Sequence, residues 1–286
     1  PAPPAPPAPP APPCTVANLR ARPKGDKGWP IACAGVTLEQ PSSEVTFDLS
    51  GAYLSYADFS GATIMPDATT HGLYDGLLNF SGARLNHADL SGAYLGVYFY
   101  AQYIDLRGAD LSGADLSDAT IGGEAYYDST VQFSAADLSH ADLSGAHVDA
   151  TGTLFSSANL TGADMSGATF GNIFASQNRV AFDHAELRAA NLSAAYFQTN
   201  NLDFSSAVLA GADMSDATVG SGSGSSWNTM APNFADADLR GADLTDTVWA
   251  PTGALDLANF ETTLFDPWAP PLPPAPPPSP PSPPPP

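Results

Sequence analysis

The chain has 286 residues, a formal net charge of −21, and only nine Lys and Arg residues against 30 Asp and Glu residues. Four of the nine basic residues cluster at Arg20, Arg22, Lys24 and Lys27, and no basic patch suited to nucleic acid is present. No apolar run approaches the roughly 18 residues that span a bilayer, so we expect no membrane span. The sequence starts without an initiator Met or a signal peptide, which favours a processed product or an excerpt.

Proline is concentrated at the two ends, with nine of the 29 prolines in residues 1–13 and thirteen in residues 269–286. Residues 1–13 read PAPPAPPAPPAPP. Because Pro fixes φ and lacks an N–H donor, this segment predicts a polyproline II arm. At about 3.1 Å per residue the arm spans about 40 Å. The arm is either a solvated spacer or a segment that is bound to a protein surface.

Residues 14–47 lack the rhythm of the chain that follows and contain Trp29, Cys14 and Cys33. We expect this segment to form a cap, because a stack of coils must cover the open end of its core. The two cysteines are either buried thiols of a cytosolic protein or a disulfide of a secreted one. Their position around the first turn, just after a proline-rich arm, favours a Cys14–Cys33 disulfide and secretion.

A five-residue period begins near residue 48 and is clearest between Asp105 and Ile121. Leu106, Leu111, Leu116 and Ile121 recur every five residues, and an Ala stands two places before each of the last three. This period is neither the 2 of a strand nor the 3.6 of a helix. Five residues instead form one side and one corner of a square coil. Such coils must stack to bury their inward side chains.

Motifs such as Ala163-Asp164-Met165-Ser166-Gly167 and Ala242-Asp243-Leu244-Thr245-Asp246 resemble the pentapeptide-repeat family. The resemblance covers roughly residues 48–266 and implies an all-β, right-handed quadrilateral β-helix with four pentapeptides per coil. We assign residues 48–268 to this β-helix. About nine coils follow, and their first inward residues are Leu49, Phe80, Leu106, Phe133, Phe155, Phe182, Phe204, Phe234 and Leu255.

The five-residue period is interrupted only between one coil and the next. The inserted residues should therefore all lie at the same corner of the β-helix. Long and short inserts alternate, and coils three, five and seven start 49 residues apart, which indicates a duplicated two-coil unit. The outward residue before the fourth inward site alternates as well, from Thr63 and Tyr94 through Thr120, His147, Thr169, Tyr196 and Thr218 to Val248.

Aromatic residues in the long inserts predict a ridge along that corner. These aromatics either pack on one another or line a docking groove for a polyproline II segment, and both interpretations remain open. The ridge residues are Tyr74, Tyr98, Phe99, Tyr100, Tyr103, Tyr126, Tyr127, Phe174 and Trp227.

Residues 269–286 form a second proline-rich arm, which resembles the hydroxyproline-rich glycoproteins of plant and algal walls. The resemblance implies hydroxylated prolines and sugars near Ser279 and Ser282. Three N-glycosylation sequons start at Asn79, Asn159 and Asn191, although the repeat generates this string by itself.

We find no catalytic constellation, cofactor motif or metal-ligand spacing, and His71, His87, His140, His147 and His184 share no pattern. The sequence therefore predicts a protein that is not an enzyme. Acidic residues precede the third inward site of nearly every coil and form a ladder. This ladder is either a strip for cations or basic partners, or a consensus feature of the repeat. Its members are Asp58, Asp89, Asp115, Asp142, Asp164, Asn191, Asp213 and Asp243.

These observations favour an extracellular structural protein that self-associates into a fibre, sheath or wall layer through the β-helix ends and the polyproline arms. The alternative is an acidic module that imitates DNA and binds topoisomerases, as some pentapeptide-repeat proteins do. Ice binding by the Thr column is a weaker third possibility, because other residues interrupt the Thr at every second coil.

Overall fold

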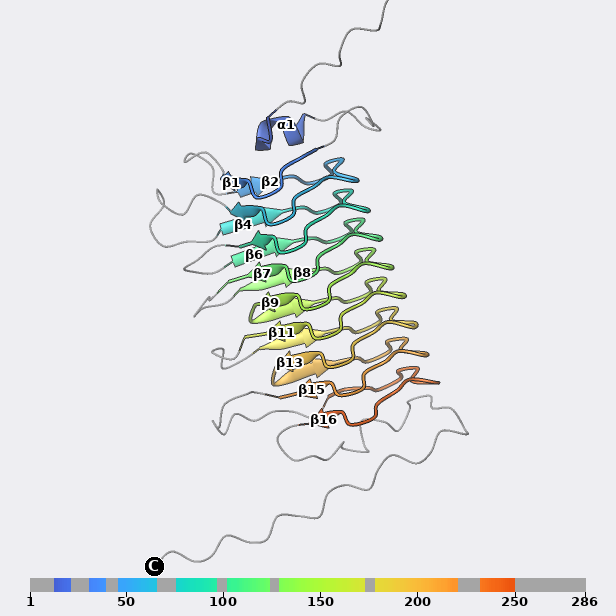
Figure 1. The fold of residues 1–286 in the computed structure, drawn as a ribbon. Coiled ribbons are helices and arrows are strands. Elements are labelled where there is room, and N and C mark those ends of the chain that lie inside the picture. Colours follow the sequence, from blue (N-terminus) through green and yellow to red (C-terminus); the bar gives the residue numbers. More distant parts are fainter. Residues whose placement is uncertain are drawn as a thin grey trace, which may run out of the picture.

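The computed structural model describes residues 13–21, 31–39, 46–65, 76–96, 102–123, 129–172, 178–220 and 232–249. In these residues the chain winds into coils that lie one on another and are joined by parallel strand pairing (Figure 1). The fold is an all-β parallel β-helix, which confirms the predicted fold class. The predicted ninth coil and both proline-rich arms lie outside the described residues.

One side of each coil adds a strand to a parallel sheet that has nine strands among the described residues. Each of these strands except β1 and β16 pairs in register with one strand below and one above. Thr120 pairs with His147 outside the core, and Ile121 pairs with Val148 inside it. In spatial order the strands are β1 (Thr37–Glu39), β3 (Thr63–Met65), β5 (Tyr94–Leu95), β7 (Thr120–Gly122), β9 (His147–Asp149), β11 (Thr169–Gly171), β13 (Tyr196–Gln198), β15 (Thr218–Val219) and β16 (Val248–Trp249).

A second parallel sheet, with seven strands in the described part of the chain, is not predicted by the five-residue period. Its strands place a large inward residue where the other sides of a coil mostly carry Ala. In Thr46-Phe47-Asp48, for example, Phe47 is fully buried two residues before Leu49. The strands are β2 (Thr46–Asp48), β4 (Gly76–Asn79), β6 (Gln102–Asp105), β8 (Thr130–Gln132), β10 (Gly152–Leu154), β12 (Arg179–Ala181) and β14 (Asn201–Asp203).

The remaining two sides of the coil are held by columns of single parallel bridges. One column runs through Tyr53, Arg84 and Asp110, and the other through Asp58, Asp89 and Asp115. Two sheets and two bridge columns give each coil four sides, as the quadrilateral prediction requires. The corners bend through a residue with positive φ, which is a Gly such as Gly113 (φ 62°) or a non-Gly residue such as His87 (φ 55°).

The core consists of columns of inward side chains that repeat from coil to coil. Phenylalanines at the first inward site stack nearly face to face at centroid distances of 4.6, 4.8, 4.9 and 5.1 Å. Burying one such side chain contributes about 1.5–3 kcal/mol, so the column is a major source of stability. Its members are Phe133, Phe155, Phe182, Phe204 and Phe234.

The start of the stack is closed by α1 (Val16–Arg20), which Figure 1 shows lying beyond the first strands. Thr15 caps this helix, and Val16 and Leu19 are buried in the same core cluster as the coils. Cys14 and Cys33 form the predicted disulfide, with Cα atoms 5.6 Å apart. The disulfide therefore fastens the helix segment to the first turn of the stack.

Parallel pairing of the stack begins before residue 48, inside the segment 14–47 that the sequence assigns to a cap. Ala32 bridges to Asp58, and β1 pairs with β3. The described part of this segment therefore contributes both strand pairing and the covering helix α1.

Between the described coils, each insert follows a strand of the nine-stranded sheet and leads to the seven-stranded side, so these inserts share one corner, as predicted. Two of them are tight turns, Ala150-Thr151 and Thr199-Asn200. Ser129 N donates to Thr151 Oγ1 (3.0 Å), and Thr151 N donates to Ser129 Oγ (3.1 Å). Asn178 and Asn200 form the same reciprocal clamp one two-coil unit later, at 3.0 and 2.8 Å. These clamps tie each short turn to the preceding coil.

Candidate functional site

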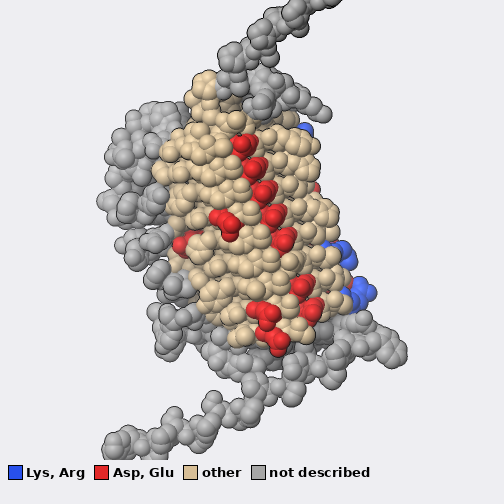
Figure 2. Space-filling model, in the orientation of Figure 1, with Lys and Arg blue, Asp and Glu red and all other residues tan. Residues whose placement is uncertain are grey.

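The acidic ladder forms one column along a side of the β-helix. Its members bridge consecutively from Asp58 to Asp243, and Figure 2 shows a column of acidic side chains running along one face. Within this column, Asp115 Oδ1 accepts hydrogen bonds from Ser117 N (2.9 Å) and Ser117 Oγ (2.6 Å). The same contact from Thr245 N lowers the pKa of Asp243. The carboxylates thus cap the corners of the coils, which explains their place in the repeat.

Asn191 shows how the ladder limits repulsion between stacked carboxylates. Its Oδ1 accepts from Ser193 N at 3.0 Å, as an aspartate would, while its Nδ2 donates to Asp164 Oδ1 of the coil before (3.1 Å). In the described residues, the ion pairs of Arg107, Arg179, Arg188 and Arg240 all go to carboxylates outside this ladder. The ladder therefore presents a column of negative charge.

Two arginines, Arg107 and Arg240, are each paired with the carboxylate two residues earlier in the same coil. Arg107 binds Asp105 through Nε (2.9 Å) and Nη2 (2.6 Å), and Arg240 binds Asp238 in the same way (2.8 and 2.6 Å). Burial alone would raise the pKa of Asp105, but the hydrogen bonds and charge of Arg107 outweigh it and lower that pKa. The hydrogen bonds from Arg240 likewise lower the pKa of Asp238. Each bidentate pair neutralises the charge of its own arginine.

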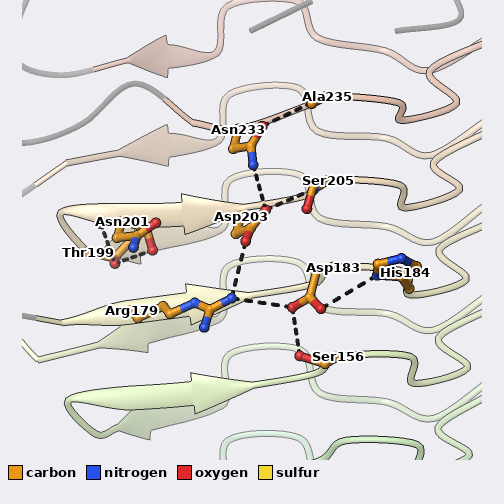
Figure 3. A network of polar contacts seen from close by, with 10 residues as sticks. All are labelled: Ser156, Arg179, Asp183, His184, Thr199, Asn201, Asp203, Ser205, Asn233 and Ala235. Atoms are coloured by element: carbon orange, nitrogen blue, oxygen red, sulfur yellow. Dashed lines mark hydrogen bonds and ion pairs between the residues drawn. The ribbon is translucent and has the colours of Figure 1, made fainter. Parts of the chain in front are cut away.

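Figure 3 shows a polar network that crosses several coils on the side of the seven-stranded sheet. Arg179 Nη2 lies 3.2 Å from Asp203 Oδ2 and 3.5 Å from Asp183 Oδ1. Ser156 Oγ donates to Asp183 Oδ1 (2.6 Å), and His184 Nδ1 lies 3.6 Å from Asp183 Oδ2. The carboxylate stands between Ser156 and the imidazole, whereas a hydrolytic triad needs the imidazole in the middle. This network therefore links neighbouring coils.

The histidines and cysteines do not assemble a metal centre in the described residues, where no group of three or more His, Cys, Asp or Glu side chains could hold an ion. His147 lies in β9 on the outer face of its sheet, with Nε2 3.9 Å from Asp149 Oδ2. Its burial lowers its pKa, because the charged form would lose water. His147 is therefore neutral near pH 7.

Two of the three sequon asparagines use their side-chain amide within the stack. Asn159 Nδ2 donates to Asp137 Oδ1 (3.0 Å), and Asn191 Nδ2 donates to Asp164. Asn79 Oδ1 accepts from Ser81 N (3.0 Å). A glycan on Asn159 or Asn191 would occupy a nitrogen that joins neighbouring coils. Ser279 and Ser282 lie outside the described residues.

The predicted aromatic ridge is largely outside the described residues, which include only Tyr103 of its nine members. The assignment of Tyr103 to an insert is wrong, because Tyr103 lies in β6 and pairs with Leu77 and Thr130. Its ring centroid lies 6.0 Å from the guanidinium carbon of Arg107, and burial raises its pKa. The signal that would have identified this strand is the large apolar residue two places before the first inward residue, as Ile104 stands before Leu106 and Phe47 before Leu49.

A second set of aromatic residues does form a column in the structure. The outer residues of the nine-stranded sheet pair in register from Thr63 through Tyr94, Thr120 and His147 to Val248. Tyr94, His147 and Tyr196 lie on every second strand, with Thr120 and Thr169 between them. All five are half-buried and in register, so their rings and hydroxyl-bearing side chains form one column on the outer face of the sheet.

None of the helices in the described part of the chain is long and apolar enough to cross a membrane.

Comparison with known proteins identifies the repeats. The family model for pentapeptide repeats matches in eight copies over residues 78–96, 101–123 and 132–172, so these residues are pentapeptide repeats. A search of curated proteins finds no match.

Several solved structures of pentapeptide-repeat proteins are similar to the chain. HetL, involved in heterocyst differentiation regulation in the cyanobacterium Nostoc sp. strain PCC 7120, is 24% identical with a TM-score of 0.28, covering 78% of this chain and 88% of HetL. Full-length QnrB1, a plasmid-mediated fluoroquinolone resistance protein, is 20% identical with a TM-score of 0.23, covering 84% and 93%. A pentapeptide-repeat protein of the Arabidopsis thaliana thylakoid lumen is 22% identical with a TM-score of 0.11, covering 76% and 88%.

Proposed function

We propose that the protein is an extracellular structural rod that self-associates, with the β-helix as its rigid body and the proline-rich ends as connecting arms. The observation that carries the proposal is the Cys14–Cys33 disulfide, which fastens α1 to the start of the stack. Disulfides of this kind persist in oxidising compartments such as the extracellular space.

The use of the polar residues supports a mechanical role. The carboxylates of the ladder cap the corners, the bidentate arginine pairs bind their own coil, and the network around Arg179 fastens coils together. These groups are therefore engaged in holding the stack. A stack whose coils contact only their neighbours extends along one axis and suits a load-bearing element.

The test of this function combines localisation with imaging of the full chain. Immunolabelling of native material should place the protein outside the cell, and negative-stain electron microscopy of the purified full chain should show fibres. Deleting residues 1–13 and 269–286 should leave a folded monomeric rod. A cytosolic protein with two free thiols, or a full chain that stays monomeric, would contradict the proposal.

The acidic ladder favours a second candidate, an interaction module that imitates DNA and binds a topoisomerase. Its charges repeat once per coil, about every 4.8 Å, whereas duplex DNA carries one charge per about 1.7 Å of axis. The ladder is thus a sparser array, which is why we rank this function second.

Replacing Asp89, Asp115 and Asp142 together by Asn discriminates between the two functions. Asn191 already occupies the same place, so the fold should survive. Inhibition of topoisomerase supercoiling by the parent chain, lost in this variant, would support the second function. No inhibition by either protein is expected for a structural rod.

A further inference from the structure

The outer column of the nine-stranded sheet has a repeat of two strands. Tyr94 lies in β5, His147 in β9 and Tyr196 in β13, and each pair is separated by one strand that carries Thr. Figure 1 shows β9, β11 and β13 following one another along the stack, with β11 between the strands of His147 and Tyr196. Strands in a sheet lie about 4.8 Å apart, so the rings repeat about every 9.6 Å.

Residues 1–13 have a matching period. Ala2, Ala5, Ala8 and Ala11 recur every three residues, and every other residue is Pro. A polyproline II helix has three residues per turn and rises about 3.1 Å per residue, so one turn is about 9.3 Å long. One turn of this segment therefore corresponds to one ring interval of the column. Over the two intervals from Tyr94 to Tyr196 the mismatch is only about 0.6 Å.

The chemistry of the two surfaces is complementary. A segment of Pro and Ala carries no charge, and its many prolines supply carbonyl acceptors and flat rings without N–H donors. The column supplies Tyr and His rings with Thr and Tyr hydroxyl groups, and between Thr63 and Val248 it contains no Lys, Arg, Asp or Glu. His147 adds no charge near neutral pH, because its burial lowers its pKa. Aromatic surfaces with such donors are a common way to hold polyproline II.

The N-terminal arm fits the column better than the C-terminal arm. In residues 269–286 the non-proline residues Leu272 and Ala275 are three apart, but the next, Ser279, follows after four. Because a polyproline II turn has three residues, this spacing of four moves the later non-proline residues to another face of the helix. The regular segment is thus residues 1–12.

We propose that the outer column from Tyr94 to Tyr196 is a docking strip for residues 1–12 of a second copy of the chain. This inference rests on the proposed self-association and names its contact. The segment starts at the end of the stack, where Pro13 O accepts from Asn18 Nδ2 (2.8 Å) and Cys14 is held by its disulfide. A stiff polyproline helix that extends beyond the end of the stack would have to bend back to reach its own column, whereas it could reach a neighbour's column without that bend.

The lengths are compatible with this arrangement. Four strand steps from Tyr94 to Tyr196 cover about 19 Å, and twelve residues of polyproline II span about 37 Å. About half of the segment thus lies on the strip, and the other half bridges the two rods. Docking costs little conformational entropy because the segment is already extended.

Site-specific photo-crosslinking of the full chain tests the strip. A benzophenone amino acid replaces Thr169, between His147 and Tyr196, and in a control protein it replaces Val208 on another side of the coil. Irradiation at Thr169 should give covalent dimers in which position 169 is joined to the peptide 1–20. Excess synthetic peptide of residues 1–13 should reduce the yield at least several-fold. Equal yields at Val208, or crosslinks at position 169 to other segments only, would overturn the strip.

A triple variant with Tyr94→Thr, His147→Thr and Tyr196→Thr removes the rings. Each ring is replaced by Thr, which the column already carries on the strands between them. Circular dichroism should show an intact β-helix, while the dimer crosslink at position 169 should fall at least tenfold. The matched control is Tyr56→Asn, which removes an exposed Tyr (69% exposed) from a corner with positive φ, where Asn is tolerated, and should change neither measurement. An unchanged crosslink in the triple variant would show that the rings do not hold the segment.

The outcomes separate this inference from the proposed function. If crosslinks formed only within one chain, the strip would not bind a second copy, and the proposal would be refuted. Fibres without the crosslink would refute the strip but leave the structural function standing. Crosslinked dimers without fibres would support the strip and refute the fibre function.

Discussion

Thr153 carries a buried hydroxyl oxygen that has no hydrogen-bond partner among the described residues. It is fully buried in β10 at an inward position, where its neighbours in the column are Val131 and Val180. A buried polar group without a partner costs about 1–3 kcal/mol. A Val side chain has the same shape as Thr and would pack against both neighbouring valines. Thr153 is therefore less favourable for stability than Val would be at this position.

We expect Thr153→Val to raise the free energy of unfolding by about 1–2 kcal/mol, because the unpaired hydroxyl is removed without leaving a cavity. Chemical denaturation of both proteins measures the change. Thr130→Val on the outer face of β8 is the control and should stay within about 0.5 kcal/mol of the parent. Destabilisation by Thr153→Val would mean that the hydroxyl has a partner in solution.

His147 should make the stability of the rod depend on pH between about 7 and 5. Its pKa is lowered in the folded state by burial, while an unfolded histidine titrates near about 6.5. As the pH falls below that value, the unfolded state takes up a proton that the folded state does not, so stability falls. His147→Thr should reduce this loss, as measured by thermal unfolding at pH 7 and pH 5. Equal losses in both proteins would exclude His147 as a cause.

At the scale of one coil, the side-and-corner unit explains what each repeat position does. Asp115 Oδ1 holds the corner through Ser117, and Leu116 points into the core, where it is 1% exposed. Adjacent residues of one pentapeptide therefore have opposite surroundings.

Three variants of this unit should rank in a fixed order. Asp115→Asn should be nearly neutral, because Asn191 makes the same corner contact. Asp115→Ala should cost about 1 kcal/mol, since the hydrogen bonds to Ser117 are lost. Leu116→Asp should be the most destabilising of the three, because it buries an unpaired charge. Thermal unfolding gives the order, and greater damage from Asp115→Asn than from Leu116→Asp would refute the inward and outward assignment.

The sequence predicts the elements where its period is regular and fails where tertiary context decides. Leu106, Leu111, Leu116 and Ile121 are all buried as expected, since four sides of a coil impose the five-residue period. The five-residue period does not reveal the strand around Tyr103, because β6 is only four residues long and adjoins an insert. The corner role of the ladder was also not derivable, because an Asp before Leu gives no direction for its carboxylate.

At the scale of the whole molecule, the stack is one-dimensional, because each coil pairs only with the coil before and the coil after. Such proteins have stabilities that add over neighbouring repeats, and local damage stays local. The clamps between Ser129 and Thr151 and between Asn178 and Asn200 join coils pairwise. The first coil has no such partner on its outer side. It depends on α1 and on the disulfide.

The double variant Cys14→Ser and Cys33→Ser should therefore loosen one end of the rod only. The disulfide closes a loop with a sequence separation of 19, and a loop of that size contributes about 3 kcal/mol in the chain-entropy model. Because Val16 and Leu19 cover the first coil, amide exchange should rise in α1, β1 and β3, while β9 to β13 keep their protection. Reducing agent should reproduce this pattern in the parent protein and add nothing in the variant. Equal loss of protection in the central strands would show that the rod unfolds as a single unit. If non-reducing mass analysis found two free thiols, the disulfide would be refuted, and the argument for secretion with it.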